Sequence, residues 1–158
     1  MGYHTSTLAL GECMTSSIES LAYRNLRKLS RYYSAVGGTP LPPRCTQAIQ
    51  LAEDDVLVGV YENTLGAITD CLVFTHLGIQ IHSESGSQSL RYADILDVNM
   101  DKSPNASSLK ADLLDGRAVT IRVTGGDAAT GSRDVAAVMQ FLMRVVGQLR
   151  EKSGKEKA

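Results

Sequence analysis

The sequence lacks basic residues over a long central stretch. Residues 45–90 contain no Lys and no Arg, although the whole chain has 16 of them. The stretch holds six of the 17 acids, so its formal charge is −6 against +5 for the rest of the chain, and the total of −1 hides this division. Such a pattern bears on partners rather than on fold. The six acids are Glu53, Asp54, Asp55, Glu62, Asp70 and Glu84.

Other scarcities limit the class of protein. There is no Trp and there are only two Phe, so aliphatic side chains must supply most of the core. No stretch approaches the ~20 apolar residues that cross a bilayer, and residues 1–11 lack the basic start and apolar run of a signal peptide. The cysteines Cys13, Cys45 and Cys71 are odd in number and follow no pattern. We expect a cytoplasmic chain with reduced thiols.

Residues 17–36 have the spacing of an amphipathic helix. Ser16-Ser17-Ile18-Glu19 matches a capping box, and Gly37-Gly38 supplies a left-handed stop. The apolar face is long enough that it must pack on the rest of the chain or on a second copy. Its members are Ile18, Leu21, Ala22, Leu26, Leu29, Tyr33 and Val36.

The other side of this predicted helix is basic. A solvated face is one interpretation, and contact with an anionic surface is the alternative. The basic residues are Arg24, Arg27, Lys28 and Arg31.

Three prolines within residues 40–43 predict a stiff, extended connector after the helix. We therefore expect an N-terminal extension at 1–44, a main domain at 45–150 and a flexible polar tail at 151–158. A stiff connector makes exchange of the helix between two chains plausible, and the charge division could support it. A homodimer is our hypothesis on this ground.

From Val56 onward the apolar period changes to two, which is typical of strands. Asp115-Gly116 is a hairpin signal, and Tyr92-Ala93-Asp94 suggests a corner. Seven antiparallel strands are predicted, at 56–61, 67–76, 79–83, 88–92, 95–100, 109–113 and 119–124. Further predictions are a short helix at 45–52, loops at 101–107 and 125–131, and a C-terminal helix at 132–150. The apolar side of that last helix comprises Val135, Val138, Met139, Leu142, Val145, Val146 and Leu149.

This order of elements resembles the pleckstrin-homology (PH) superfold. Residues 66–75, Gly-Ala-Ile-Thr-Asp-Cys-Leu-Val-Phe-Thr, are similar to the second strand of bacterial PH-like domains. Residues 89–95, Ser-Leu-Arg-Tyr-Ala-Asp-Ile, are similar to their recurring Tyr-x-Asp-Ile step. The resemblance covers residues 53–150 and implies an α+β fold. That fold is a PH-like barrel of about seven antiparallel strands capped by the C-terminal helix, with the N-terminal amphipathic helix added. PH-like folds bind lipids, peptides or proteins, so the resemblance does not choose among them.

Patterns for catalysis and metal binding are weak. A two-residue turn at 77–78 would pair His76 with Ile79 and Val73 with His82, which places the two imidazoles on opposite faces. They could not share an ion in that register, and no Cys lies at zinc spacing. No nucleophile motif is present. We expect no enzyme activity, no cofactor and no metal.

The loop at 125–131, Gly-Gly-Asp-Ala-Ala-Thr-Gly, superficially resembles a phosphate loop. It lacks the Gly-Lys-Ser/Thr ending, and Asp127 would repel phosphate. We interpret it as a plain connection.

Two functions remain. The first is a protein-binding module whose acidic sheet face meets a basic protein, as an inhibitor or immunity protein would. The alternative is a membrane-lipid binder that uses the basic N-terminal helix, although a basic protein rather than a membrane is the expected partner. The loop at 62–66 offers no cation to an inositol phosphate, so we expect no lipid recognition there. A near-neutral isoelectric point opposes nucleic-acid binding.

Overall fold

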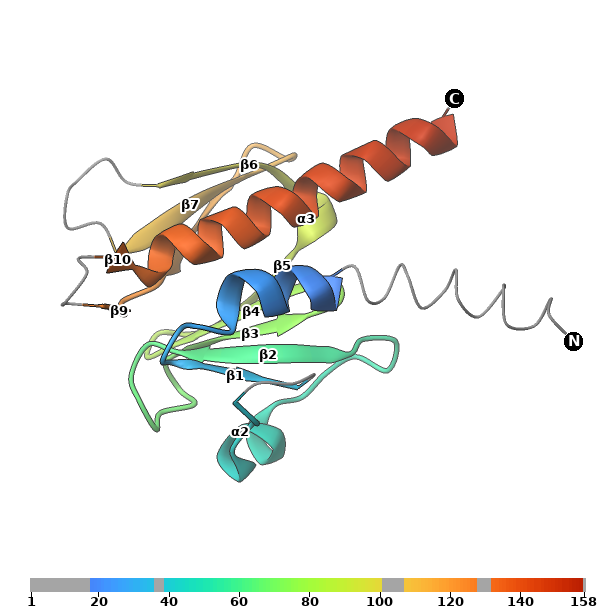
Figure 1. The fold of residues 1–158 in the computed structure, drawn as a ribbon. Helices are drawn as coiled ribbons and strands as arrows, with labels where there is room; N and C mark the ends of the chain where they lie inside the picture. The colour runs from blue at the N-terminus through green and yellow to red at the C-terminus, as the bar shows by residue number, and fades with distance from the viewer. Residues whose placement is uncertain (1–17, 36–38, 101–106, 128–131, 158) are drawn as a thin grey trace, which may run out of the picture.

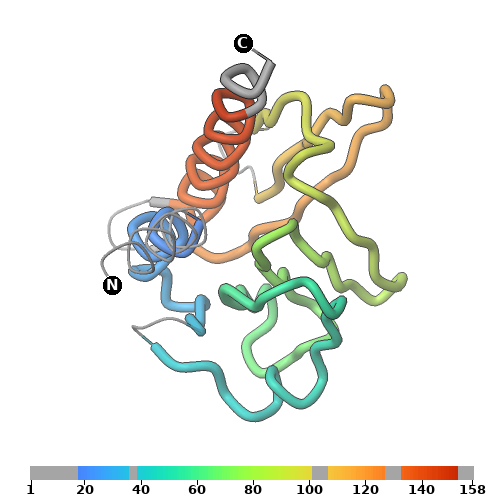
Figure 2. The backbone as a smooth tube through the Cα atoms, turned by 90° about the vertical axis from the view of Figure 1, so that its right-hand side faces the viewer, coloured from blue at the N-terminus to red at the C-terminus, as the bar shows by residue number. Residues whose placement is uncertain are grey.

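The computed structural model describes residues 18–35, 39–100, 107–127 and 132–157 of the chain. These residues form an α+β fold of two antiparallel sheets, with a helix packed on them from each end of the chain (Figure 1). Seen from the side, the N-terminal helix (residues 18–26) and the C-terminal helix α3 (Asp134–Lys157) lie next to each other, on one side of the strands (Figure 2).

The larger sheet has five strands in chain order, each antiparallel to the next. Its first strand lies before the proline-rich connector, so the segment assigned to an N-terminal extension contributes to this sheet. The strands are β1 (Tyr32–Ser34), β2 (Leu57–Glu62), β3 (Cys71–Thr75), β4 (Gly78–Ser83) and β5 (Gly86–Arg91).

The smaller sheet has three strands, and the short 3-10 helix η1 (Tyr92–Asp94) leads into it at the predicted corner. Gly116 has a φ of +90° in the turn between its last two strands, which confirms the hairpin predicted there. Part of the predicted loop at 125–131 is a small hairpin, while residues 128–131 lie outside the described residues. The remaining strands are β6 (Ile95–Met100), β7 (Ser108–Leu113), β8 (Ala118–Arg122), β9 (Gly126–Asp127) and β10 (Ser132–Arg133).

Helix α3 buries the predicted apolar face against η1 and the smaller sheet. Val138 and Leu142 are fully buried, as expected. Phe141 is also fully buried and makes edge-to-face contacts with Phe74 and Tyr92, although the helical pattern did not single it out. The helix continues past the predicted end at residue 150, because the Glu and Lys residues that follow are good helix formers.

The prediction of one helix over 17–36 is wrong in its second half. The described helix ends at residue 26, and Tyr32–Ser34 forms β1 instead. The Tyr32 ring lies against Gly59, where a Cβ would be 2.0 Å from the Tyr32 hydroxyl oxygen, and it meets Phe74 edge to face. Tertiary burial of an aromatic residue therefore overrides the helical spacing. Ser16, Ser17 and the Gly37-Gly38 stop lie outside the described residues.

The N-terminal helix packs on its own chain. Leu21, Ala22 and Leu26 are buried in the main hydrophobic core, together with residues of both sheets and α3. The prediction that this apolar face is covered is confirmed. The apolar face thus has its cover within one chain, and exchange between two chains is not needed to bury it.

The predicted register of the β3–β4 hairpin is wrong by two residues. Phe74 pairs with Ile79 and Cys71 pairs with His82, so four residues rather than two form the turn. The Thr75 hydroxyl accepts from the N–H groups of Leu77 and Gly78, which stabilises the longer turn. His76 consequently lies in the turn and not in the strand.

A second, smaller core covers the outer face of β2 and β3. Its buried members are Cys45, Val60, Cys71 and Val73, and the short helix α2 (Pro43–Ala48) lies over them. This helix begins earlier than predicted, because proline is well tolerated in the first turn. Strand β3 begins later than predicted, since residues 67–70 form turns closed by Ala67 N–H to Thr64 O and Asp70 N–H to Ala67 O.

Candidate functional site

The six acids of the central stretch do not form one face. Glu62 is fully buried, and its carboxylate accepts two hydrogen bonds from Arg44, at 3.0 Å to Oε2 and 2.8 Å to Oε1. The backbone N–H of Gly66 donates a third at 3.1 Å. A carboxylate held in this way belongs to the interior and offers no surface to a partner.

The pKa of Glu62 follows from this environment. Burial alone would raise it, but the hydrogen bonds from Arg44 and from the Gly66 N–H outweigh burial and hold the pKa below its ordinary value. The same bond raises the pKa of the Arg44 guanidinium. Glu62 therefore stays ionised and joins helix α2, through Arg44, to the loop after β2.

Other arginines from outside the acidic stretch reach the same loop. Arg122 pairs with Asp70 at 2.8 Å, and Asp70 also accepts from the Thr64 hydroxyl at 2.8 Å. Arg31 donates to the backbone carbonyl of Asn63 at 2.5 Å. The loop contains no cation of its own, yet the fold supplies three, so the division of charge along the sequence is not a division in space.

The remaining acids lie at two separate places. Glu53 and Asp54 are exposed in the loop before β2, and Asp55 accepts from the N–H groups of Val56 and Leu77, which holds that loop to the β3–β4 turn. Glu84 is exposed in the β4–β5 turn, at the other end of β4. A basic protein as partner stays a prediction, and it now depends on Glu53, Asp54 and Glu84.

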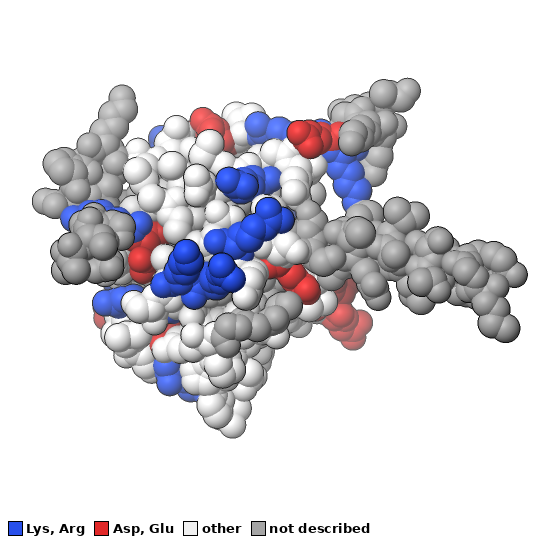
Figure 3. Space-filling view, viewed as in Figure 1, with Lys and Arg blue, Asp and Glu red and all other residues white. Residues whose placement is uncertain are grey.

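Basic side chains gather on one face instead. Figure 3 shows them over the N-terminal helix and the middle of α3, with acidic side chains at the margins. Arg24 is exposed on the N-terminal helix, Arg27 and Lys28 are exposed in the turn that follows it, and Arg144 is exposed on α3. Among the described residues none of these four forms an ion pair. We call Arg24, Arg27, Lys28 and Arg144 the basic patch.

Arg31, the fourth cation predicted for this face, is not part of the basic patch, because its guanidinium is bonded to the loop at Asn63. Arg144 was missed. It follows the exposed positions Gln140 and Met143 on the side of α3 that is opposite the core, so helical spacing alone could have placed it on the surface.

Two apolar side chains accompany the basic patch on the same helices. Tyr23 is 39% exposed, and the Arg27 guanidinium lies 4.6 Å above the centre of its ring. Met143 precedes Arg144 and is 52% exposed. Cationic heads beside half-exposed apolar groups are typical of surfaces that meet an interface between water and lipid.

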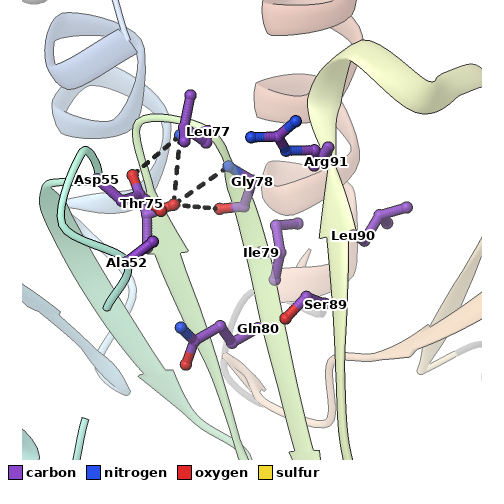
Figure 4. Close-up of a pocket in the computed structure, with 10 residues that line it drawn as sticks. All are labelled: Ala52, Asp55, Thr75, Leu77, Gly78, Ile79, Gln80, Ser89, Leu90 and Arg91. Carbon is purple, nitrogen blue, oxygen red and sulfur yellow. Dashed lines mark hydrogen bonds between the residues drawn. The ribbon is translucent and has the colours of Figure 1, made fainter. Parts of the chain in front are cut away.

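A pocket of about 220 Å³ lies where the loop before β2 faces β4 and β5 (Figure 4). The Thr75 hydroxyl in it donates to the Gly78 carbonyl at 3.2 Å, and Asp55 is occupied with backbone N–H groups. Arg91 and Ser89 line the other side. The polar groups on the Thr75 side thus hold the β3–β4 turn, and they form no pair of acid and base.

Metal-ligating and nucleophilic side chains are dispersed. No group of three His, Cys, Asp or Glu residues that could hold an ion occurs in the described part of the chain. His76 contacts Glu19 at 2.9 Å, whereas His82 contacts Gln80 at 3.2 Å. Burial raises the pKa of the Cys71 thiol to about 12, so its thiolate is disfavoured.

Comparisons of the chain with protein-family models, with curated proteins and with solved structures find no match. No described helix is both long enough and apolar enough to span a bilayer.

Proposed function

We propose that this protein is a PH-like, non-enzymatic binding module that docks on anionic membrane surfaces through the basic patch. For the fold, the support is that strands β2–β8 are seven antiparallel strands in two sheets, followed by one long helix. Strand β1 is then an addition at the sheet edge from the N-terminal segment. This is the order of elements that the resemblance implies.

The observation that carries the binding proposal is the basic patch. Arg24, Arg27 and Lys28 belong to the N-terminal helix and its following turn, Arg144 belongs to α3, and none of the four forms an ion pair with a described residue. Figure 3 shows basic side chains gathered on one face over these two elements. Cations that serve only solubility are normally interspersed with acids. The exposed Tyr23 and Met143 favour a bilayer over a soluble polyanion, since apolar groups gain from entering the headgroup region.

The expected strength of binding follows from the number of charges. Each Lys or Arg near an anionic leaflet contributes about 1 kcal/mol, so four contribute about 4 kcal/mol. That corresponds to a dissociation constant in the millimolar range. The interaction should therefore be reversible and should weaken steeply with salt, because the Debye length falls from ~30 Å at 0.01 M to ~3 Å at 1 M.

Vesicle sedimentation tests this proposal. We expect phosphatidylserine-containing vesicles to retain the protein at low salt, and phosphatidylcholine vesicles to leave it in solution. The variant Arg24→Glu/Lys28→Glu should lose retention. The charge-matched control Lys110→Glu/Arg117→Glu, on exposed cations of β7 and its following turn, should keep it.

A lipid site at the loop 62–66 is not part of the proposal. Glu62 is buried and paired there, so replacing it with a cation would disrupt the interior rather than build a site.

Phosphoinositide vesicles and phosphatidylserine vesicles of equal surface charge should retain the protein equally. Retention on heparin beads but not on vesicles would contradict the membrane assignment.

A further inference from the structure

Strand β5 is an open edge of the larger sheet. It pairs with β4 on one side, and no described strand pairs with its other side. Five of its six residues are exposed, all except Leu90. A strand exposed on its edge presents unpaired N–H and C=O groups, which are a template for another strand.

The register identifies which backbone groups face outward. The Tyr92 N–H donates to the Leu77 carbonyl, and residue 92 thus bonds toward β4. Because bonding direction alternates along an antiparallel strand, Gln88 and Leu90 also bond toward β4. The N–H and C=O groups of Ser87, Ser89 and Arg91 therefore point away from the sheet.

In the described part of the chain, the opposite edge of the same sheet, strand β1, is covered by a neighbouring segment, unlike β5. On β1, the Ser34 N–H donates to the Thr39 carbonyl at 2.7 Å, and a bridge joins Ser34 to Pro40. Strand β5 has no such cover among the described residues. It contains neither Pro nor Lys, and its register with β4 is uninterrupted by a bulge. Three of the usual devices against edge pairing, a proline, a lysine and a bulge, are therefore absent from this strand.

We propose that the outer edge of β5 binds a second copy of this chain, strand β5 against strand β5 in antiparallel orientation. A register centred on Gln88 pairs Ser87 with Ser89 of the second copy and joins the two larger sheets into one. It also brings Arg91, at the end of β5, close to the β4–β5 turn of the second copy, which carries Glu84. Two-fold symmetry repeats every contact.

Charge complementarity favours a second copy of this chain as the partner of the β5 edge. Glu84 lies in the turn just before β5 and Arg91 at the end of the strand, both are exposed, and neither forms an ion pair with another described residue. Antiparallel self-pairing brings unlike charges together at both ends, whereas parallel pairing would bring like charges together. The strand is thus complementary to itself in one orientation only. This proposal does not depend on the basic patch or on membrane binding.

Light scattering after size-exclusion chromatography measures the proposed dimer. At about 100 µM the unmodified chain should elute with twice the 17.0 kDa protomer mass, since we expect a micromolar dissociation constant. A monomer at that concentration would overturn the proposal.

Ser89→Pro is the backbone test. It removes an N–H that points outward, so the sheet should be kept while the dimer is lost. The control Ser89→Thr keeps the N–H and the strand preference, and it should remain dimeric. Equal dimerisation of both variants would refute strand pairing at this edge.

A charge swap tests the pairing even if Ser89→Pro fails to fold. Arg91→Glu alone and Glu84→Arg alone each place like charges together, and each should weaken the dimer about tenfold. The double variant Glu84→Arg/Arg91→Glu restores unlike pairs and should regain the original dissociation constant. Additive weakening in the double variant would contradict the proposed contact.

Discussion

At the residue scale, two buried tyrosines differ in how much their hydroxyl groups contribute to stability, because only one hydroxyl has hydrogen-bond partners among the described residues. The Tyr61 hydroxyl donates to Asp134 Oδ2 at 2.7 Å and accepts from the Gly125 N–H at 2.8 Å. These bonds join β2 to the start of α3. The Tyr32 hydroxyl is also buried, but it has no hydrogen-bond partner in the described part of the chain. Burial of a polar group costs free energy unless a hydrogen bond offsets it.

The first prediction compares the two hydroxyls. Tyr61→Phe should lower the free energy of unfolding by about 1–3 kcal/mol, because it leaves the Asp134 carboxylate and the Gly125 N–H without their partner. Tyr32→Phe removes an unsatisfied group and should be neutral or stabilising. Urea denaturation measures both values. Equal losses in the two variants would show that the hydrogen bonds of Tyr61 do not matter.

The second prediction concerns pH and Glu62. Its pKa is depressed in the folded state, so its pairing with Arg44 stabilises the fold above the unfolded pKa of about 4.3. This stabilisation is lost as the pH falls below 4.3 and through the folded pKa. At pH 7 the urea midpoint of Glu62→Gln should therefore be lower than that of the unmodified chain. Near pH 3 the difference between the two midpoints should be smaller. The same difference in urea midpoint at both pH values would contradict an ionised Glu62.

At the element scale, strong periodicity was a reliable guide and short aromatic segments were not. The C-terminal helix and the strands from Val56 onward could be predicted, because apolar spacing and the Asp115-Gly116 signal agree with the tertiary fold. Residues 29–35 could not be predicted, since Leu29 and Tyr33 fit helical spacing although Tyr32–Ser34 forms β1. The strand there is stabilised by pairing with β2 and by the space that Gly59 leaves for the Tyr32 ring, and both are tertiary contacts.

The register of the β3–β4 hairpin could not be predicted from the sequence either, because it also depends on a tertiary contact. The turn is set by the Thr75 hydroxyl and by Asp55, which bonds to it from a loop some twenty residues earlier. Local turn rules contain no information about such a contact.

The third prediction tests the packing of α3 on the sheets. Leu142 is fully buried, so Leu142→Ala should cost about 2–5 kcal/mol of unfolding free energy. Its neighbour Met143 is 52% exposed, and Met143→Ala should change stability by no more than about 0.5 kcal/mol. Thermal or urea unfolding compares the two. A loss at Met143 as large as that at Leu142 would mean that α3 packs by a different face.

At the scale of the whole molecule, charge along the chain and charge in space differ. The sequence divides into an acidic centre and basic flanks, which suggested an acidic sheet face. Folding brings Arg31, Arg44 and Arg122 to the loop between β2 and β3, where Arg44 and Arg122 pair with two acids of that centre. The cations that remain unpaired among the described residues on the helices then form the basic patch. Three of its four members were visible in the sequence, whereas Arg144 joins them only through the packing of α3.

The claim that the two helices form a single basic surface is tested most directly by vesicle partitioning of two single variants. Arg24→Gln on the N-terminal helix and Arg144→Gln on α3 each remove one charge. Each should lower the partition coefficient on phosphatidylserine vesicles about fivefold, which corresponds to ~1 kcal/mol per cation. A fivefold loss in Arg24→Gln with no change in Arg144→Gln would contradict a surface shared by both helices.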